Sequence, residues 1–539
     1  MTTYVPIRGS ARSLLPNSRA AGPVDPSEMA SLTIRLRSVG DPSSLIDKAY
    51  QLGNTPLGQR QYLTHDQLEA AHGASATDLN TIEQFAQTHN LTVVRRSAGE
   101  RSVIVRGHLG DLLNAFHADV RMYHHATGTY RGRTGEISIP QELNGVVTGV
   151  FGFDTRPKQR APRRLMGGNA SGPGGDNGVP ATYFANRYQF PTKAGQTALD
   201  GTGQTVAIIE LGGGYQNSDL QVYFQEIKAA APSVTSVSVD GATNTPNSSD
   251  PSDGEVMLDI EVVGAVVPQA NIVVYFAPNN GDQGFMDAIS AAIHDTERKP
   301  DVISISWGGP EDYTDAQAVQ AFRELFAAAA TLGITVCAAS GDHGTADLDA
   351  SHWDQKIHVD HPACDDLVLG CGGTQIDSAS EADVAWNDGT PFDPNVQGGG
   401  GWVGGGGISQ VIPVPSYQNN ANLPVSIVTG NAGRGVPDIA MSAVNYFIRV
   451  DTYEGASGGT SAVAPLMAGL IARLNQAKQK RVGFINPFLY ANAAGGATKD
   501  VTDGTNGIKN TVNGYNAGPG WDACTGLGTP NGTTILDLL

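Results

Sequence analysis

Between residues 206 and 339 the sequence alternates short apolar runs with longer amphipathic ones, and this alternation restricts the fold more than any other feature. Strands are expected at 206–210, 271–276, 302–307 and 334–339, and helices at 255–267, 285–294 and 316–332. Strands that alternate with helices predict an α/β fold with a parallel, doubly wound sheet. Functional residues of such folds lie at the carboxyl ends of the strands. Glu210, Trp307 and Asp342 occupy such positions.

A different pattern precedes this region. Strands are expected at 32–37, 91–95, 102–105 and 137–139, and a helix at 79–89, which together predict a compact α+β domain. Residues 156–178 are rich in Arg, Pro, Gly and Asn, a composition that predicts an exposed linker where proteolytic nicking concentrates. Since 539 residues exceed one average domain, we expect an α+β domain over 1–155, a linker over 156–180 and a larger domain over 181–539.

The charge is divided unevenly between these parts. Residues 1–180 carry a net charge of +4, whereas residues 181–539 carry −23. The two parts are therefore expected to attract each other, and the acidic surface argues against nucleic-acid binding. No apolar run is long enough to span a bilayer, and the first 22 residues lack the hydrophobic segment of a standard secretory signal.

Two further features have structural interpretations. The four cysteines show no metal-binding spacing, and Cys337 lies in an apolar run that predicts a buried small side chain. The glycine-rich run at 397–408 lacks the Lys-Ser/Thr of a phosphate-binding loop, so it is expected to be a flexible surface loop.

The segment from Gly458 to Pro465 reads as a tight loop that leads into a helix, with Ser461 in the first helical turn. A serine there lies beside unpaired backbone N–H groups and the positive end of the helix dipole, a favourable position for a nucleophile. The alternative is that Thr460 or Ser461 simply caps the helix, which is the ordinary use of these residues.

Glu255 and Asp259 are four residues apart on an expected helix and therefore share one face. The neighbouring residues are apolar, and burial is costly for two acids unless they share a proton or find donors. A functional acid pair is favoured over a solvated acidic stripe, an alternative that suits Glu261 better.

Four motifs in this order, DGEVMLDIEV, SISWGG, AASGDHG and GGTSAVAPL, resemble those of the sedolisins, the serine-carboxyl peptidases. The resemblance covers essentially the whole chain and implies a propeptide, a linker and a subtilisin-like catalytic domain. It implies that Ser461 is the nucleophile, Glu255 the general base, Asp259 the group that orients Glu255, and Asp342 the oxyanion donor. It also implies that Glu210 and Trp307 extend the acid network and that Asp360 is an acidic residue of a substrate subsite.

Elementary chemistry agrees with these roles. A histidine base would be protonated in acid, whereas a carboxylate with a pKa of about 4 to 5 still accepts a proton there. Asp342 can donate to an oxyanion only when it is itself protonated. Both points predict an enzyme that acts in acid, with His343 a bystander beside Asp342.

Near the C-terminus, Asp500 and Asp522 stand beside turns that could supply carbonyl oxygens to a hard cation. From the residues alone, ordinary turn aspartates are the more common explanation. The resemblance implies instead one Ca²⁺ ion, held by the carboxylates of Asp500 and Asp522 and the backbone oxygens of Val501, Gly518 and Gly520.

Three hypotheses follow. The first is an acid-acting endopeptidase made as a proenzyme, the second a tripeptidyl-peptidase, and the third a non-catalytic, secreted calcium-binding scaffold. For the first we expect polypeptide substrates, the chain's own propeptide as a partner, a monomeric state and, by family resemblance, an extracellular location. Acid is expected to separate the two halves by protonating carboxylates, and the linker to be cut between about Arg160 and Gly178.

Overall fold

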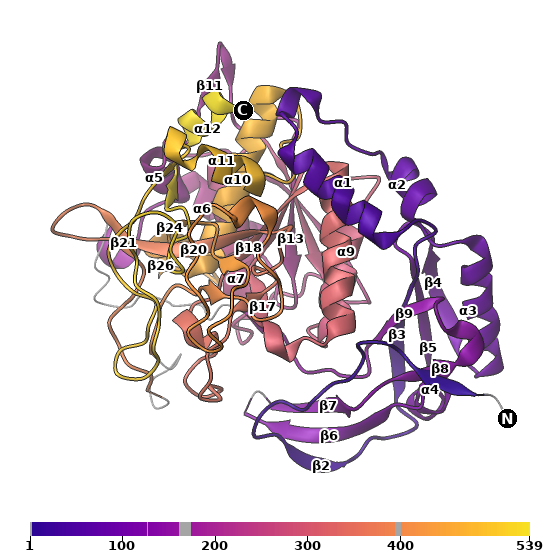
Figure 1. Ribbon diagram of the computed structural model, residues 1–539. Helices are drawn as coiled ribbons and strands as arrows, with labels where there is room; N and C mark the ends of the chain where they lie inside the picture. The colour runs from indigo at the N-terminus through magenta and orange to yellow at the C-terminus, as the bar shows by residue number, and fades with distance from the viewer. Residues whose placement is uncertain (1–2, 127, 161–173, 394–399) are drawn as a thin grey trace.

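A computed structural model describes residues 3–126, 128–160, 174–393 and 400–539. The chain forms an N-terminal domain that lies against one flank of a larger C-terminal domain (Figure 1). The carboxyl-terminal helix α12 and the N-terminal strand β1 lie at opposite ends of the molecule in this view.

The C-terminal domain is built on an eight-stranded sheet. Its order begins β14-β15-β13-β16-β18-β20, and all of these neighbours are parallel. Beyond them β20 pairs in parallel with β24 and antiparallel with β21. The strands are β13 (Thr205–Glu210), β14 (Ser233–Ser238), β15 (Asn271–Phe276), β16 (Val302–Ile305), β18 (Thr335–Ala339), β20 (Leu369–Ile376), β21 (Asp383–Ala385) and β24 (Ile439–Ser442). The expected parallel, doubly wound sheet is confirmed.

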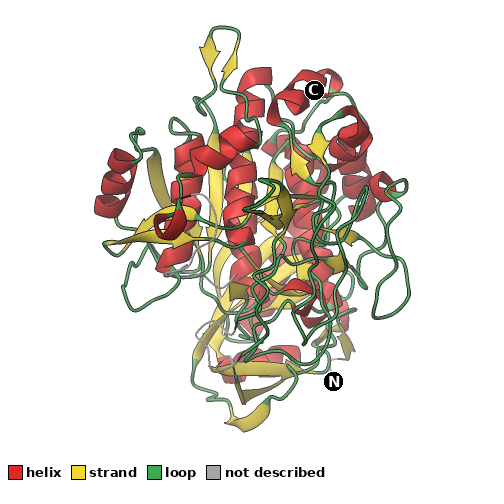
Figure 2. Ribbon diagram, turned by 90° about the vertical axis from the view of Figure 1, so that its left-hand side faces the viewer, coloured by secondary structure: helices red, strands yellow, loops and turns green. Residues whose placement is uncertain are grey.

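Helices cover both faces of this sheet (Figure 2). Alternate side chains of β13, such as Val206 and Ala207, enter two separate apolar cores, as strand geometry requires. One core holds α7 (Asp253–Val266) and α10 (Thr460–Lys478), and the other holds α8 (Asp282–Ile293) and α9 (Ala316–Leu332). Smaller helices are α5 (Ala181–Arg187), α6 (Asn217–Glu226), α11 (Asn486–Asn492) and α12 (Gly532–Leu538).

The expected strand over 302–307 is shorter in the structure. Strand β16 ends at Ile305, and a second strand, β17 (Trp307–Pro310), begins two residues later outside the main sheet. β17 pairs antiparallel with β19 (Asp360–His361) and with β10 (Gln159–Arg160) in a separate small sheet. Ser306 and Trp307 therefore lie where the backbone turns away from the sheet.

The N-terminal domain contains an antiparallel sheet in the order β4-β5-β3-β9. Its strands are β3 (Met29–Leu36), β4 (Thr92–Ser97), β5 (Ser102–His108) and β9 (Val147–Phe151), and its helices are α1 (Pro42–Asn54), α2 (His65–His72), α3 (Ala76–Thr88) and α4 (Leu109–Phe116). A second sheet joins β2 (Arg19–Pro23), β6 (Asp119–His125) and β7 (Gly128–Thr134), and β1 (Tyr4–Pro6) pairs with β8 (Ser138–Pro140). The expected α+β pattern is present.

Buried ion pairs join the two domains. Arg12 lies 2.5 Å from Asp282, Arg101 2.5 Å from Glu324, and Arg133 2.7 Å from Asp315. In addition, α1 packs along α9 (Figure 1). The attraction expected from the net charges is thus carried by specific basic residues of the N-terminal domain and acids of α8 and α9.

The linker corrects one expectation. Its first residue, Arg156, is buried, and Gln159–Arg160 form β10 against β17, so the start of the segment is not exposed. The reason is that β17 offers free backbone partners at its edge, and an extended chain can pair with them. Most of the segment in which cleavage is expected, 161–173, lies outside the described residues.

The glycine-rich run at 397–408 corrects a second expectation over 400–408, since 397–399 lie outside the described residues. From Gly400 to Ile408 the chain is buried, and Gly407–Ile408 form β22, which pairs with β23 (Gly435–Val436). The glycines permit backbone to pack directly on backbone: a side chain at Gly405 would collide with the carbonyl group of Ser340. A composition typical of loops therefore forms an interior wall here.

Small antiparallel pairs of strands complete the C-terminal domain. They join β11 (Lys193–Ala194) to β12 (Thr197–Ala198), β25 (Tyr446–Val450) to β26 (Tyr453–Ser457), and β27 (Thr498–Lys499) to β28 (Thr529–Pro530). All four cysteines are buried and free, which confirms the prediction for Cys337. In the part of the chain that the structure describes, no helix combines the length and apolar character that crossing a membrane requires.

Candidate active site

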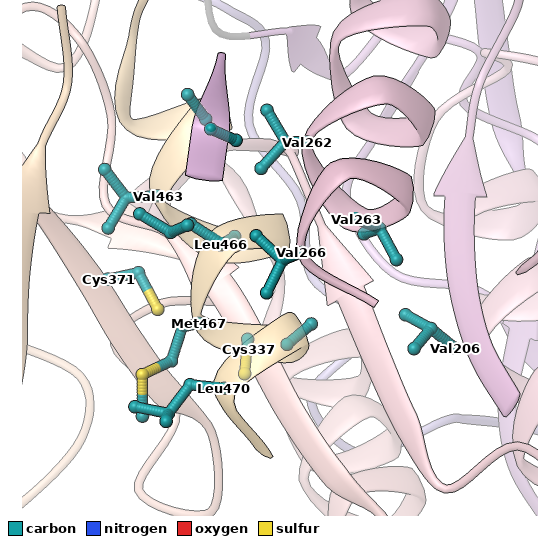
Figure 3. Packing of buried hydrophobic residues seen from close by; sticks show 14 of the residues in the cluster. Val206, Val262, Val263, Val266, Cys337, Cys371, Val463, Leu466, Met467 and Leu470 are labelled. Atoms are coloured by element: carbon teal, nitrogen blue, oxygen red, sulfur yellow. The ribbon is translucent and has the colours of Figure 1, made fainter. Parts of the chain in front are cut away.

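Two helices set the position of the site. Val262 and Val266 of α7 face α10 near Leu466, whereas Val263 points to the other side of α7, toward Val206 of β13 (Figure 3). Helices that follow parallel strands start at the carboxyl edge of the sheet. The close packing of α7 on α10 therefore brings the first turns that carry Glu255 and Ser461 to the same edge.

Ser461 is the second residue of α10 and is buried. The N-cap is Gly459, with φ of +131°, and no side chain caps the helix, so the capping alternative is wrong. Among the described residues the Ser461 hydroxyl has no hydrogen-bond partner. It is thus available to a substrate at the positive end of the helix dipole.

A chain of acids leads away from Ser461. The Ser306 hydroxyl lies 2.8 and 3.0 Å from the two carboxylate oxygens of Asp259 and 3.3 Å from the backbone oxygen of Ser461. The indole N–H of Trp307 donates to Glu210 at 2.9 Å. Burial, followed by the charge of Glu255, raises the pKa of Asp259 well above its ordinary value.

Burial also raises the pKa of Glu210, and the nearby charges of Asp259 and Glu255 raise it further. The three carboxyl groups are therefore close enough to share protons rather than carry three charges. The structure thus brings together the acid pair and the two residues, Glu210 and Trp307, that were expected to extend it.

Asp342 is held by Thr460, the residue directly before Ser461. Its Oδ1 accepts hydrogen bonds from the backbone N–H and the hydroxyl of Thr460, at 2.7 and 2.8 Å. Its Oδ2 has no partner among the described residues, and a side chain at Gly459 would overlap it. Burial raises the pKa of Asp342 to about 7, so in acid this carboxyl carries a proton.

Two contributors were not predicted from the sequence. Ser306 holds Asp259, and Thr460 holds Asp342. The only signal available was their position, each directly before Trp307 or Ser461. The expectation that Glu261 is solvated is wrong: its side chain is fully buried and accepts the backbone N–H of Arg449 at 3.0 Å.

His343 is buried and packs on the Trp402 ring, with ring centroids 5.0 Å apart. Its Nδ1 lies 3.3 Å from the backbone oxygen of Gly401. These contacts tie His343 to the glycine-rich wall, as a bystander role requires.

Asp360 belongs to β19 and is buried beside Gly308, where a side chain would overlap its carboxylate. Burial raises the pKa of Asp360 to about 8, while the charge of Lys158 in the linker opposes that shift. Asp360 therefore lies near enough to the linker for the charge of Lys158 to act on its carboxyl group.

Asp522 ends the turn at 517–522, and Asp500 contacts the same turn from another part of the chain. The N–H of Gly520 donates to Asp500 at 2.8 Å, and the N–H of Gly518 donates to Asp522 at 3.1 Å. The Thr525 hydroxyl lies within 3.4 Å of both the Val501 carbonyl oxygen and the Asp522 carboxylate. The residues of the predicted calcium site thus lie near one another, although the contacts of Gly518 and Gly520 are made by their N–H groups, and their carbonyl oxygens would have to serve the ion.

Only two of those ligands are charged, and no group of three or more His, Cys, Asp or Glu residues suited to a metal occurs among the described residues. The donor set of two carboxylates and three carbonyls still fits a calcium ion, which accepts backbone oxygens readily.

Comparisons with known proteins identify the family of the chain. The pro-kumamolisin activation domain matches residues 16–156, and the subtilase family matches residues 201–488. Kumamolisin of Bacillus sp. (strain MN-32) is 42% identical over 99% of this chain and 96% of its own length. The chain belongs to the sedolisin family. It is a serine-type peptidase with a propeptide activation domain and a subtilisin-like catalytic domain.

Other sedolisin-family relatives differ in their named activity. Tripeptidyl-peptidase sed5 of Aspergillus fumigatus is 28% identical over 99% of this chain and 97% of its own. The structure of Pseudomonas sedolisin, a serine-carboxyl proteinase complexed with two molecules of pseudo-iodotyrostatin, superposes with a TM-score of 0.58. It is 28% identical and covers 68% of this chain and 98% of its own.

Proposed function

We propose that the protein is an acid-acting serine-carboxyl endopeptidase, made as a proenzyme that processes itself at low pH. One observation carries the proposal: Ser461 stands in the first turn of α10, where Ser306 links its backbone to the buried Asp259 and the preceding residue, Thr460, holds the buried carboxyl group of Asp342.

In this proposal Ser461 attacks the carbonyl carbon of the substrate while Glu255 accepts its proton. Asp259, held by Ser306, orients and couples to Glu255, and Glu210 with Trp307 completes the acid network. Glu255 then returns the proton to the leaving amine. In the second half of the reaction, water attacks the acyl group on Ser461 while Glu255 accepts a proton from the water. Glu255 finally returns that proton to the Ser461 oxygen as the acid product leaves.

Asp342 would stabilise the tetrahedral intermediate. Its Oδ1 is occupied by two donors from Thr460, which leaves Oδ2 as the atom that carries the proton and donates it to the oxyanion. This role needs the protonated carboxyl and therefore a pH below the Asp342 pKa of about 7.

The linker supports self-processing and endopeptidase action. An internal stretch of chain, β10, pairs with β17 so that Arg160 lies opposite Trp307. A tripeptidyl-peptidase, by contrast, needs a free amino terminus near the scissile bond. The sequence match to a tripeptidyl-peptidase keeps that activity as the alternative, and mass spectrometry of the products from one long peptide separates the two.

Asp360 would bind a basic side chain of the substrate, and one Ca²⁺ ion would be held by Asp500, Val501, Gly518, Gly520 and Asp522. The ion would supply a structural cross-link between the 500–501 segment and the turn at 517–522. We further propose a monomeric, secreted enzyme.

The test is casein hydrolysis across the acid range by the wild-type protein and by Ser461→Ala. The variant should lose hydrolysis and remain uncleaved at the linker while keeping its fold. Ser457→Ala, which removes another buried hydroxyl four residues earlier, serves as the matched control and should stay active. Substantial hydrolysis by Ser461→Ala would sink the proposal.

A further inference from the structure

The catalytic domain holds the backbone of the linker one residue before β10. The Lys158 N–H donates to the Asn279 side-chain oxygen at 2.7 Å, and the Asn279 side-chain N–H donates to the Lys158 carbonyl oxygen at 3.0 Å. One amide side chain thus satisfies both polar groups of an extended residue. Because these contacts involve only the backbone of Lys158, any residue other than proline could make them.

The Lys158 side chain enters a separate, buried compartment. Its Nζ lies 2.8 Å from Asp282 Oδ1 and 3.4 Å from the Thr314 hydroxyl. The rings of Phe285 and Phe322 lie 6.0 Å from the same nitrogen. The two charged side chains are only 10% and 3% exposed, so this pair is largely removed from water and its strength is not screened as at a surface.

Maturation would remove the two cations that pair with the Asp282 carboxylate. Its second oxygen lies 2.5 Å from Arg12, so both cations that pair with it come from the propeptide and the linker. These two cations hold the pKa of Asp282 far below its ordinary range, although burial acts in the other direction. Once both segments leave, the catalytic domain keeps a recessed carboxylate at the N-terminus of α8, with a cation site beside it.

We propose that the mature peptidase selects substrates through a subsite in which Asn279 binds the backbone and Asp282 binds a Lys or Arg side chain. The position is the one that Lys158 takes in the linker, two residues before the residue opposite Trp307. The direct partner of the Lys158 side chain is Asp282, whereas in the described residues Asp360, whose carboxylate lies beside Gly308, feels the Lys158 charge without a direct contact to it. The inference rests on the proposed peptidase function.

The test uses peptides that span residues 154–168 of the linker, with Lys158 kept or replaced by Arg, Gln or Glu. The mature enzyme should cleave the Lys and Arg peptides with a kcat/KM about tenfold or more above that of the Gln peptide, because a buried hydrogen bond between charged groups is lost. The Glu peptide should be the poorest substrate. Mass spectrometry should locate the cut downstream of position 158, toward the carboxyl end of the peptide, in every peptide that is cleaved.

Asp282→Asn should lower the ratio of kcat/KM for the Lys peptide over the Gln peptide to about one. Asp537→Asn, which makes the same charge change on the exposed C-terminal helix, is the matched control and should keep the preference. If Asp282→Asn yields no folded mature enzyme, the peptide series on the wild-type enzyme decides alone.

Equal cleavage of the Lys and Gln peptides by the wild type, or a preference that persists in Asp282→Asn, overturns the subsite while leaving the peptidase function intact. Cleavage of no peptide at all contradicts the proposed function and the subsite together.

Discussion

Buried carboxyl groups dominate the site at the scale of single residues. Burial raises the pKa of Glu210, Asp259, Asp342 and Asp360, in each case as the largest cause. Such acids keep their protons at a pH where exposed aspartates and glutamates are ionised. A site of this kind can use a carboxyl group both as a base and as a hydrogen-bond donor, depending on its partners.

Asp342 provides a direct test. Asp342→Ala should lower kcat about 100- to 1000-fold, the usual cost of losing an oxyanion donor. Because its pKa is raised to about 7, the donor form is present below that pH and is lost as the pH rises through it. The wild-type rate should therefore fall above about pH 7.

Asp342→Asn separates protonation from shape. The amide can place an N–H at the position of Oδ2 without titrating, so this variant should keep more activity than Asp342→Ala and lose the decline near pH 7. The measurement is kcat against pH for all three proteins. An Asp342→Ala variant with nearly normal turnover would contradict the assignment.

Sequence reasoning identified the residues with distinctive chemistry and missed those that act through position. Ser461, Glu255 and Asp342 stand in motifs whose residue types indicate catalysis. The contribution of Ser306 depends on a contact with Asp259, 47 positions away along the chain, which no local pattern records. Likewise the charge of Glu261 predicted an exposed side chain, because the sequence does not reveal that the segment at Arg449 packs over it and donates a backbone N–H to it.

At the scale of elements, the glycine-rich wall supports Asp342, the proposed oxyanion donor. The backbone N–H of Val403 donates to the Asp342 carbonyl oxygen at 2.9 Å, and that of Gly405 donates to Gly341 at 2.8 Å. The glycine-rich segment therefore holds in place the loop that follows β18 and carries Asp342.

Gly405→Ala should damage this wall, because its methyl group would meet the carbonyl of Ser340. Overpacking typically costs about 1 to 3 kcal/mol, and a backbone carbonyl cannot move aside as a flexible side chain does. Thermal inactivation should be faster and kcat lower. Gly389→Ala, where a side chain would meet open space, is the control, although its φ of +70° adds some strain. Equal rates of thermal inactivation for Gly405→Ala and the wild type would show that the backbone around residue 405 can shift to accommodate the methyl group.

The C-terminal turn at 517–522 gives the metal prediction. If Ca²⁺ binds Asp500 and Asp522, chelator should lower the melting temperature of the wild-type protein, because an ion bound only by the folded state stabilises it by mass action. Asp500→Ala should melt at the lower temperature and should no longer respond to chelator. Asp503→Ala, a neighbouring exposed turn aspartate, is the control and should retain the response. Identical melting of the wild type with calcium and with excess chelator would favour ordinary turn aspartates.

The elements themselves were largely predictable because apolar periodicity reflects burial. The strands at 206–210 and 271–276 and the helix at 316–332 match β13, β15 and α9. The break after Ile305 was not visible, since the apolar run continues to Trp307 while the backbone leaves the sheet. The glycine-rich wall was missed for a related reason: backbone packing on a distant strand leaves no hydrophobic signature.

For the whole molecule, net charge predicted that the domains attract but not which groups respond to acid. The Arg12 and Lys158 side chains hold the pKa of Asp282 so low that ordinary acid leaves it ionised. Arg101 similarly lowers the pKa of Glu324, although burial opposes the shift. Interface stability from these acids is present above their unpaired pKa and is lost as the pH falls through the lower, paired value.

His294 is better placed to respond. It ends α8 and faces Arg35, His65 and Glu100 of the propeptide, and burial lowers its pKa to about 4 despite the opposing charge of Glu100. The docked protein therefore keeps His294 neutral down to about pH 4, whereas a water-exposed histidine takes a proton near pH 6.5. If separation exposes His294, the docked state loses up to about 1.4 kcal/mol per pH unit as the pH falls from about 6.5 to about 4.

We therefore predict that acid separates the propeptide from the catalytic domain and that His294 helps to set the pH at which it does so. In the full-length Ser461→Ala protein, which cannot cut itself, X-ray scattering should show an increase in the radius of gyration as the pH falls below about 6. His294→Gln removes the titrating ring, so its transition should move to lower pH, whereas His124→Gln, at an exposed histidine of the propeptide, should leave it unchanged. A His294→Gln transition at the wild-type pH would assign the trigger to other groups, and a radius that stays constant down to pH 3 would refute acid-driven separation.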